Sequence, residues 1–157
     1  MNREKIIQLI LDELELNLNS LIDSTKDASD HASHEDAQAK SKWDTQAIEA
    51  SYLAAGHAAK AKKLLEDIQS IHGMLADIED HQEQVFAGSV VKCSLNDSIE
   101  YFFVSSYGGG LETTFKGLTI TVVSPKTPLG QNLIGSKVGD TVLLLNGTKM
   151  NVLELLQ

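Results

Sequence analysis

The chain has 157 residues, 42% of them apolar, and a formal net charge of −9, so it can bury one core or two small ones. The phosphate backbone of DNA repels a chain with this negative charge, so direct binding to duplex DNA is not expected. A basic protein or a metal ion is a more suitable partner. A single cysteine excludes an internal disulfide, and without a signal peptide or an apolar run of about 20 residues the sequence predicts a cytoplasmic protein with no membrane anchor.

The two halves of the chain differ in composition. Both prolines and nine of the eleven glycines follow residue 85, so helix breakers are rare before it. Residues 1 to 84 carry 17 of the 22 acidic and 8 of the 13 basic side chains, and the whole net charge therefore belongs to this half. We expect two domains, an acidic helical one over residues 1 to 84 and a neutral one over residues 85 to 157.

Residues 1 to 84 have the heptad pattern of two long helices, with apolar residues at alternating steps of four and three. The two seams match if the helices pack antiparallel about a turn at residues 42 and 43, with Thr25 opposite Ala61. This predicts a coiled-coil hairpin with its tip near residues 41 to 45. Leucine and isoleucine fill the seam at the base, whereas alanine and threonine fill it toward the tip, so we expect a slender and weakly packed distal part.

From residue 85 onward the sequence predicts short strands. Turn residues at Asn96-Asp97, Gly108-Gly109-Gly110 and Asn146-Gly147 separate runs that are rich in β-branched and aromatic side chains. Pro128 suits the first turn of a helix and Gly135 its end, which predicts a short helix over residues 128 to 134. The result is a small antiparallel sheet crossed by one helix, an α+β module. The expected strands cover residues 89–95, 100–105, 118–123, 141–145 and 149–153.

The sheet half also carries a familiar motif. Ser124-Pro125, then Leu133-Ile134-Gly135, then Val138-Gly139-Asp140-Thr141-Val142 resemble, in order and spacing, a signature of the bacterial transcript cleavage factors of the GreA/GreB family. Val85-Phe86-Ala87-Gly88-Ser89-Val90 and Tyr101-Phe102-Phe103-Val104 resemble the first strands of the same domain, so the resemblance covers about residues 85 to 145.

This resemblance implies a fold and a partner for the sheet half. The fold is FKBP-like, without isomerase activity, and it docks on the rim of RNA polymerase beside the opening of the secondary channel. The glycines and Asp140 of the motif also shape turns. The motif residues that we take as candidate partner contacts are Ser124, Pro125, Leu133, Ile134 and Gly135.

The same family places acidic residues at the hairpin tip, where they help to hold the second Mg²⁺ of the polymerase active site. The corresponding residues here are Asp44 and Glu49, which precede a Tyr52-Leu53-Ala54-Ala55 run that resembles the family's Tyr-x-Ala-Ala. The two acids are five positions apart instead of three, a net rotation of about 140° on a helix, so both reach one ion only if Asp44 lies in the loop. Glu35 and Asp36 are the alternative acids near the tip.

Under this resemblance the chain is a ligand donor and not an enzyme. A weakly held second Mg²⁺ is stabilised when further carboxylates approach it, and it then activates water for attack on the RNA backbone. The chain therefore needs no cofactor of its own and shares the Mg²⁺ of RNA polymerase. We expect a monomer whose Lys42 and Trp43 contact the polymerase or the 3′ end of the nascent RNA.

Each tip residue also has a purely structural interpretation. Asp44 suits the N-cap of the second helix, and Glu49 lies where acids interact favourably with the helix dipole. Glu35 and Asp36 suit a solvated helix face, and Trp43 can fold back onto the turn instead of meeting a partner.

Two other functions stay open, and two other sites are disfavoured. The chain can be a polymerase-binding regulator that inhibits without cleavage, or a coiled-coil dimer whose sheet domain binds an unrelated protein. His31 and His34 lack a third firm ligand for zinc. Cys93 alternates inward on a strand and suits a core position better than a nucleophile.

Overall fold

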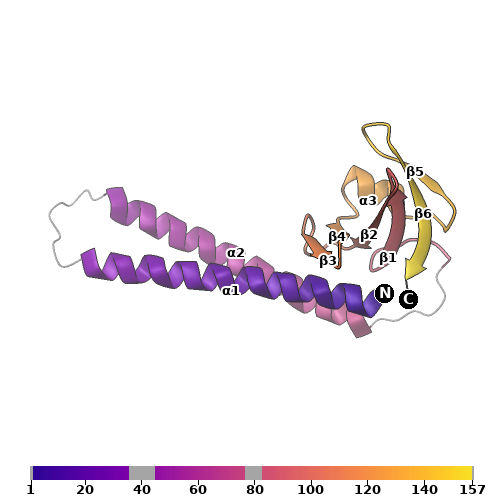
Figure 1. Cartoon of the computed structure of the whole chain (residues 1–157). Coiled ribbons are helices and arrows are strands. Elements are labelled where there is room, and N and C mark those ends of the chain that lie inside the picture. The colour runs from indigo at the N-terminus through magenta and orange to yellow at the C-terminus, as the bar shows by residue number, and fades with distance from the viewer. Residues whose placement is uncertain (1, 36–44, 77–82, 157) are drawn as a thin grey trace. The chain divides into compact units, whose positions relative to one another are not determined.

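The computed structural model describes residues 2–35, 45–76 and 83–156, and it describes the side chains of residues 2–26, 52–75 and 83–156. Helices α1 (Arg3–Glu35) and α2 (Thr45–Ala76) lie side by side and antiparallel (Figure 1). The expected hairpin tip, apart from Thr45, falls in residues 36–44, outside the described residues, so its position stays a prediction.

Burial along the hairpin follows the expected gradient. Ile7, Leu11 and Leu14 at the base of α1 and Ile71 in α2 are buried. Farther along both helices the seam is only partly covered. The half-buried seam residues are Leu21, Thr25, His57, Ala61 and Leu64. Small side chains leave less apolar area to bury, which confirms the prediction of weaker packing for the described part of the distal seam.

One polar contact joins the two helices in the described part of the distal seam. Thr25 Oγ1 lies 3.1 Å from Nδ1 of His57, and it donates its own proton to the carbonyl of Leu21 at 2.7 Å. Ala61, which was expected opposite Thr25, lines the same hollow as Thr25 and His57. The register of the distal seam stays a prediction.

The sheet half contains six strands in the order β3-β4-β2-β1-β6-β5, together with helix α3 (Pro128–Leu133) (Figure 1). The expected α+β class, a helical hairpin followed by a sheet domain with one short helix, is confirmed. All strand pairs are antiparallel except β2 with β4, which is parallel. The strands are β1 (Val90–Leu95), β2 (Ser98–Val104), β3 (Glu112–Phe115), β4 (Leu118–Val123), β5 (Thr141–Leu143) and β6 (Lys149–Leu156).

Strand β3 was not expected, and it explains the parallel pair. The chain leaves β2, forms β3 at the sheet edge, and returns as β4 beside β2. Lys116 and Gly117 both have positive φ (51° and 77°) and connect Phe115 to Leu118 in a two-residue turn. The β-branched and aromatic run Thr113-Thr114-Phe115 before this turn was the signal for β3 in the sequence.

Buried residues lie on both faces of the sheet. One face forms a core beneath α3 with Phe102, Val104 and Leu133 among its members. On the other face Phe103 and Ile120 are also buried. Met1–Glu13 and Asp67–Gln157 form one compact unit, and Leu14–Glu66 form a second. The base of the hairpin therefore belongs to the same compact unit as the sheet, and the expected domain division between residues 84 and 85 stays a prediction.

Candidate functional site

The first part of the motif builds the entry into α3. The carbonyl of Ser124 accepts from the backbone N–H and the hydroxyl of Thr127, at 3.0 and 2.8 Å, and the Thr127 side chain caps the helix by accepting from Gly130 N–H at 3.2 Å. A Cβ at Gly130 would lie 2.0 Å from the Ser124 carbonyl oxygen. Ser124 and Pro125 therefore pack against α3 at a distance that is possible only because residue 130 is a glycine.

The middle of the motif divides into one core residue and one exposed residue. Leu133 is fully buried, whereas Ile134 is 41% exposed. Gly135, with φ of 83°, donates its N–H to the carbonyl of Val85 at 2.8 Å. Among the candidate partner contacts, Ile134 is thus the exposed apolar one. Leu133 reaches no surface, and its role in the motif is to anchor α3.

The last part of the motif forms the turn into β5. Gly139, with φ of 95°, donates to the carbonyl of Val152 at 2.8 Å, and Val152 N–H donates to the carbonyl of Asp140 at 2.9 Å. The Asp140 carboxylate accepts from Lys137 N–H at 2.8 Å. These bonds support the structural interpretation of the glycines and Asp140, and they leave Val138 exposed at the turn.

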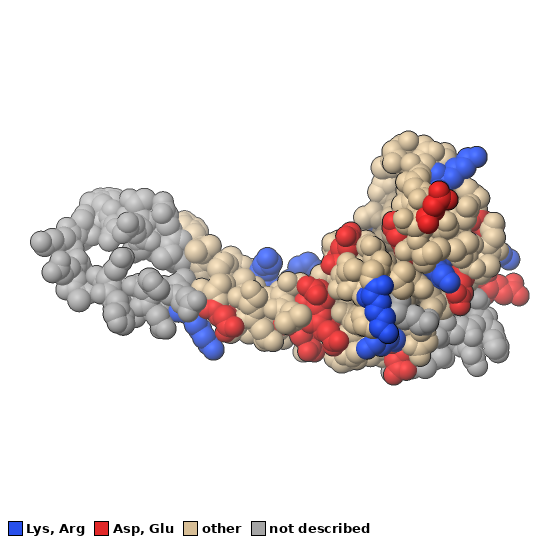
Figure 2. All heavy atoms as spheres, in the orientation of Figure 1, with Lys and Arg blue, Asp and Glu red and all other residues tan. Residues whose placement is uncertain are grey.

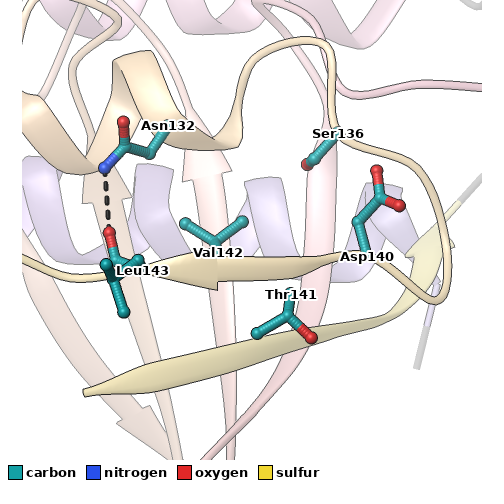
Figure 3. A pocket seen from close by; sticks show the side chains of 6 residues that line it. All are labelled: Asn132, Ser136, Asp140, Thr141, Val142 and Leu143. Atoms are coloured by element: carbon teal, nitrogen blue, oxygen red, sulfur yellow. Dashed lines mark hydrogen bonds between the residues drawn. The ribbon is translucent and has the colours of Figure 1, made fainter. Parts of the chain in front are cut away.

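A groove lies between α3 and the edge strand β5, and we call it the α3–β5 groove (Figure 3). The Asn132 amide crosses it and donates to the Leu143 carbonyl at 3.0 Å. Asn132 lines both a polar hollow of about 580 Å³, between α3 and β5, and an apolar hollow of about 340 Å³, between α3 and the turn after β5. The polar hollow is lined by Asn132, Ser136, Asp140, Thr141, Val142 and Leu143, and the apolar one by Thr127, Pro128, Leu129, Asn132, Leu144, Leu145 and Asn146.

Large apolar side chains are exposed on the segment that runs from the end of α3 to the turn after β5. Leu145 is 86% exposed, Leu143 57% and Val138 56%. We call these three residues and Ile134 the apolar rim, and Leu143 and Leu145 of this set line the groove. Sequence reasoning missed Leu143 and Leu145, although a half-buried strand alternates apolar with polar residues and here three successive leucines follow Val142. Exposed apolar side chains next to a groove are typical of a surface that binds another protein.

The groove itself carries little charge. Asp140 is the one acidic or basic residue among those that line its two hollows. Elsewhere, acidic and basic side chains both occur on the described part of the hairpin and on the sheet domain, on the face that Figure 2 shows. The ion pairs Lys62–Glu66 and Lys137–Glu83 are exposed, at 3.9 and 3.8 Å, and such pairs contribute little to stability. A groove without basic side chains suits an apolar partner surface better than a phosphate backbone.

The predicted tip residues lie mostly beyond what the structure describes. Asp36, Lys42, Trp43 and Asp44 fall in residues 36–44, outside the described residues. Glu35 is the last residue of α1 and Glu49 lies near the start of α2, and their side chains are likewise outside the described ones. The metal-binding and RNA-contacting roles of these six residues therefore stay predictions.

The described residues offer no other obvious chemical centre. Among the side chains that the structure describes, no three His, Cys, Asp or Glu residues lie close enough to hold a metal ion. Burial, with a smaller effect from the charge of Glu100, raises the pKa of the Cys93 thiol to about 12. Cys93 is thus a protonated core residue, as its strand position indicated. No helix within the described ranges is both long and apolar enough to cross a bilayer.

Comparison with known proteins gives structural neighbours only. No protein-family model matches the chain, and no curated protein matches its sequence. It is similar to a crystal structure of GreA factor homolog 1 (Gfh1) of Thermus thermophilus, with 17% identity, a TM-score of 0.39 and 94% of each chain covered. Thermus aquaticus Gfh1 gives 17%, 0.36 and 93%, and a further structure of the transcription factor Gfh1 gives 19%, 0.36 and 92%. At this level of similarity the function has to be argued from the chain's own residues.

Proposed function

We propose that this chain is a transcription factor that binds RNA polymerase through the α3–β5 groove and inserts its helical hairpin into the secondary channel. The observation that carries this function is that the Gre-like motif builds α3 and the turn into β5 and leaves the apolar rim exposed. Burial of Leu145 and Leu143 against a partner releases water from apolar surface, which favours binding.

The hairpin supports the same function by its construction. Leu14–Glu66 form a compact unit apart from the one that contains the sheet. Toward the tip, the residues of α2 that face the hollow beside Thr25 include the small Ala54, Ala58 and Ala61, so the two helices need little width there. A slender rod that the sheet core does not require suits insertion into a narrow opening.

A finer part of the function concerns the hairpin tip. We propose that Asp44 and Glu49, with Glu35 and Asp36 as alternatives, offer carboxylate oxygens to the second Mg²⁺ of the polymerase. Oxygen ligands are the ones that Mg²⁺ prefers, and that ion supplies water activation for hydrolysis of the RNA. The chain donates ligands, holds no cofactor of its own, and leaves catalysis to the polymerase.

Backtracked polymerase tests this finer part. We expect the purified chain with Mg²⁺ to shorten the transcript on a sequencing gel, and Asp44→Ala to abolish the shortening. No shortening at saturating protein rejects the cleavage activity. Altered initiation or elongation without shortening supports an inhibitory factor instead, which the five-residue spacing of Asp44 and Glu49 favours as the second candidate.

Retention on immobilised core polymerase tests the docking part. The wild-type chain is expected to be retained, and a variant with an aspartate at Leu145 is expected to be lost in the wash. A wild-type chain that is not retained, and that sediments as a homodimer at micromolar concentration, supports a dimeric interaction module and rejects the polymerase function.

A further inference from the structure

Arg3 joins the end of the hairpin to the start of the sheet. Its Nε donates to the carbonyl of Gly88 at 3.2 Å, and one of its terminal nitrogens donates to the carbonyl of Met74 at 2.8 Å. Met74 lies in the last turn of α2, and Gly88 lies just before β1. The Arg3 guanidinium, in the first turn of α1, therefore contacts both the last turn of α2 and the segment before β1.

The chemistry of arginine suits this position. The last carbonyls of a helix have no partner within the helix, and Met74 provides one of these in α2. A cation at this end of a helix also interacts favourably with the helix dipole. The planar guanidinium carries several N–H donors in a fixed fork, so it can serve two carbonyls at once, which a lysine ammonium does with less directional preference.

Gly88 is itself held in place by a backbone hydrogen bond to the sheet. Its own N–H donates to the carbonyl of Val104 at 2.7 Å, which ties it to the end of β2. Three residues earlier, Val85 is buried and exchanges two backbone hydrogen bonds of 2.8 Å with Gly135 and Ser136. The same short segment thus contacts Arg3 on one side and, on the other, the loop that follows α3 beside the α3–β5 groove.

Two further contacts join the base of the hairpin to other strands. Lys5 Nζ lies 5.7 Å from the centre of the Phe115 ring in β3, a cation–π distance. The Ser105 hydroxyl, just after β2, lies 4.0 Å from the Met74 sulfur. With Arg3 and Gly88, the hairpin base is held at three separate elements of the sheet domain. Contacts at three elements restrict rotation more than one contact does.

We propose that Arg3 is a positioning residue, which fixes the base of the hairpin on the sheet domain. This role rests on the proposed function, because a fixed hairpin base matters to the polymerase only if docking and insertion take place together. The docking surface itself does not include Arg3, so docking and arm-dependent effects should separate when Arg3 is changed.

Distances between spin labels test the positioning without any polymerase. Nitroxides at Gln69→Cys and Asn146→Cys report the hairpin base and the sheet domain, while the buried Cys93 stays unlabelled in the folded chain. We expect one narrow distance distribution in the parent chain, a distribution at least twofold wider in Arg3→Met, and an intermediate width in Arg3→Lys. The control Lys62→Met removes an exposed cation and should leave the width unchanged. An unchanged width in Arg3→Met overturns the role.

Polymerase assays then connect the role to function. Arg3→Met should be retained on core polymerase within twofold of the wild type, yet lose at least tenfold of the effect on backtracked complexes, with partial rescue by Arg3→Lys. Equal losses of retention and effect point to general unfolding and contradict the positioning role. If Arg3→Met does not fold, Arg3→Lys and Arg3→Gln are compared instead. A wild type that is not retained rejects the proposed function, and the distance measurement still decides the role of Arg3.

Discussion

The side-chain amide of Asn132 donates to the backbone carbonyl of Leu143 at 3.0 Å and joins α3 to the edge strand β5. Asn132 lines both hollows of the α3–β5 groove, and its hydrogen bond joins the two elements that flank the polar hollow. Edge strands usually leave such carbonyls to water. The groove is therefore formed before a partner binds in it.

Asn132→Ala should lower the free energy of unfolding, because it removes this hydrogen bond. A hydrogen bond of this kind contributes about 0.5 to 1.5 kcal/mol, and its exposure to water suggests the lower part of that range. Chemical denaturation of Asn132→Ala measures the loss, with Gln131→Ala as the control on the same helix. A loss in the control as large as in Asn132→Ala would assign the effect to helix α3 and not to the bond.

Leu145 separates recognition from stability. Because its side chain is 86% exposed, Leu145→Asp should change the free energy of unfolding by no more than about 0.5 kcal/mol. Retention on RNA polymerase should fall at least tenfold, since the charge has to be desolvated against an apolar partner. Leu153→Asp on β6 is the matched control, because Leu153 is also exposed and lines neither hollow of the groove. Equal retention of both variants and the wild type would contradict docking through the apolar rim.

Two glycines should respond oppositely to the addition of one methyl group. At Gly130 the new Cβ would lie 2.0 Å from the Ser124 carbonyl oxygen, so Gly130→Ala has to displace backbone and should cost about 1 to 3 kcal/mol. At Gly56, inside α2, nothing lies within 4 Å of the position of a Cβ, and Gly56→Ala should stabilise the helix by up to about 1 kcal/mol. Thermal unfolding of both variants checks the pair. A stable Gly130→Ala would mean that Ser124-Pro125 does not pack on α3 as described.

The raised pKa of the Cys93 thiol predicts that the free energy of unfolding falls at alkaline pH. Burial raises its pKa from 9.0 to about 12 in the folded chain, so the unfolded chain releases the proton first as the pH rises. Stability is therefore unaffected by this group below pH 9.0 and falls between 9.0 and about 12, by at most about 1.4 kcal/mol per pH unit. The difference between wild type and Cys93→Ala isolates this effect from other titrating groups. At pH 8 the native thiol should also resist alkylating reagents until the chain unfolds.

Most of the fold was readable from local patterns in the sequence. Heptad spacing gave both long helices, and paired turn residues such as Asn96 and Asp97, both with positive φ, marked the first hairpin of the sheet. Pro128 gave the start of α3. These features depend on interactions between residues that are close in sequence, and so they can be predicted without knowledge of the tertiary contacts.

Features that depend on distant contacts were missed. The parallel pairing of β2 with β4 depends on a crossover that no local pattern encodes. The exposure of Leu143 goes with the position of β5 at an edge of the sheet, and the exposed Leu145 lies in the turn after β5.

The sheet ends in its two shortest strands, β3 with four residues and β5 with three. Short edges offer few free backbone groups for a strand of another molecule, and on β5 one carbonyl is already occupied. Strand-by-strand growth into fibrils is therefore discouraged at both sides of the sheet. The leucines beside β5 can stay uncovered in a crowded cell without becoming a nucleus for aggregation.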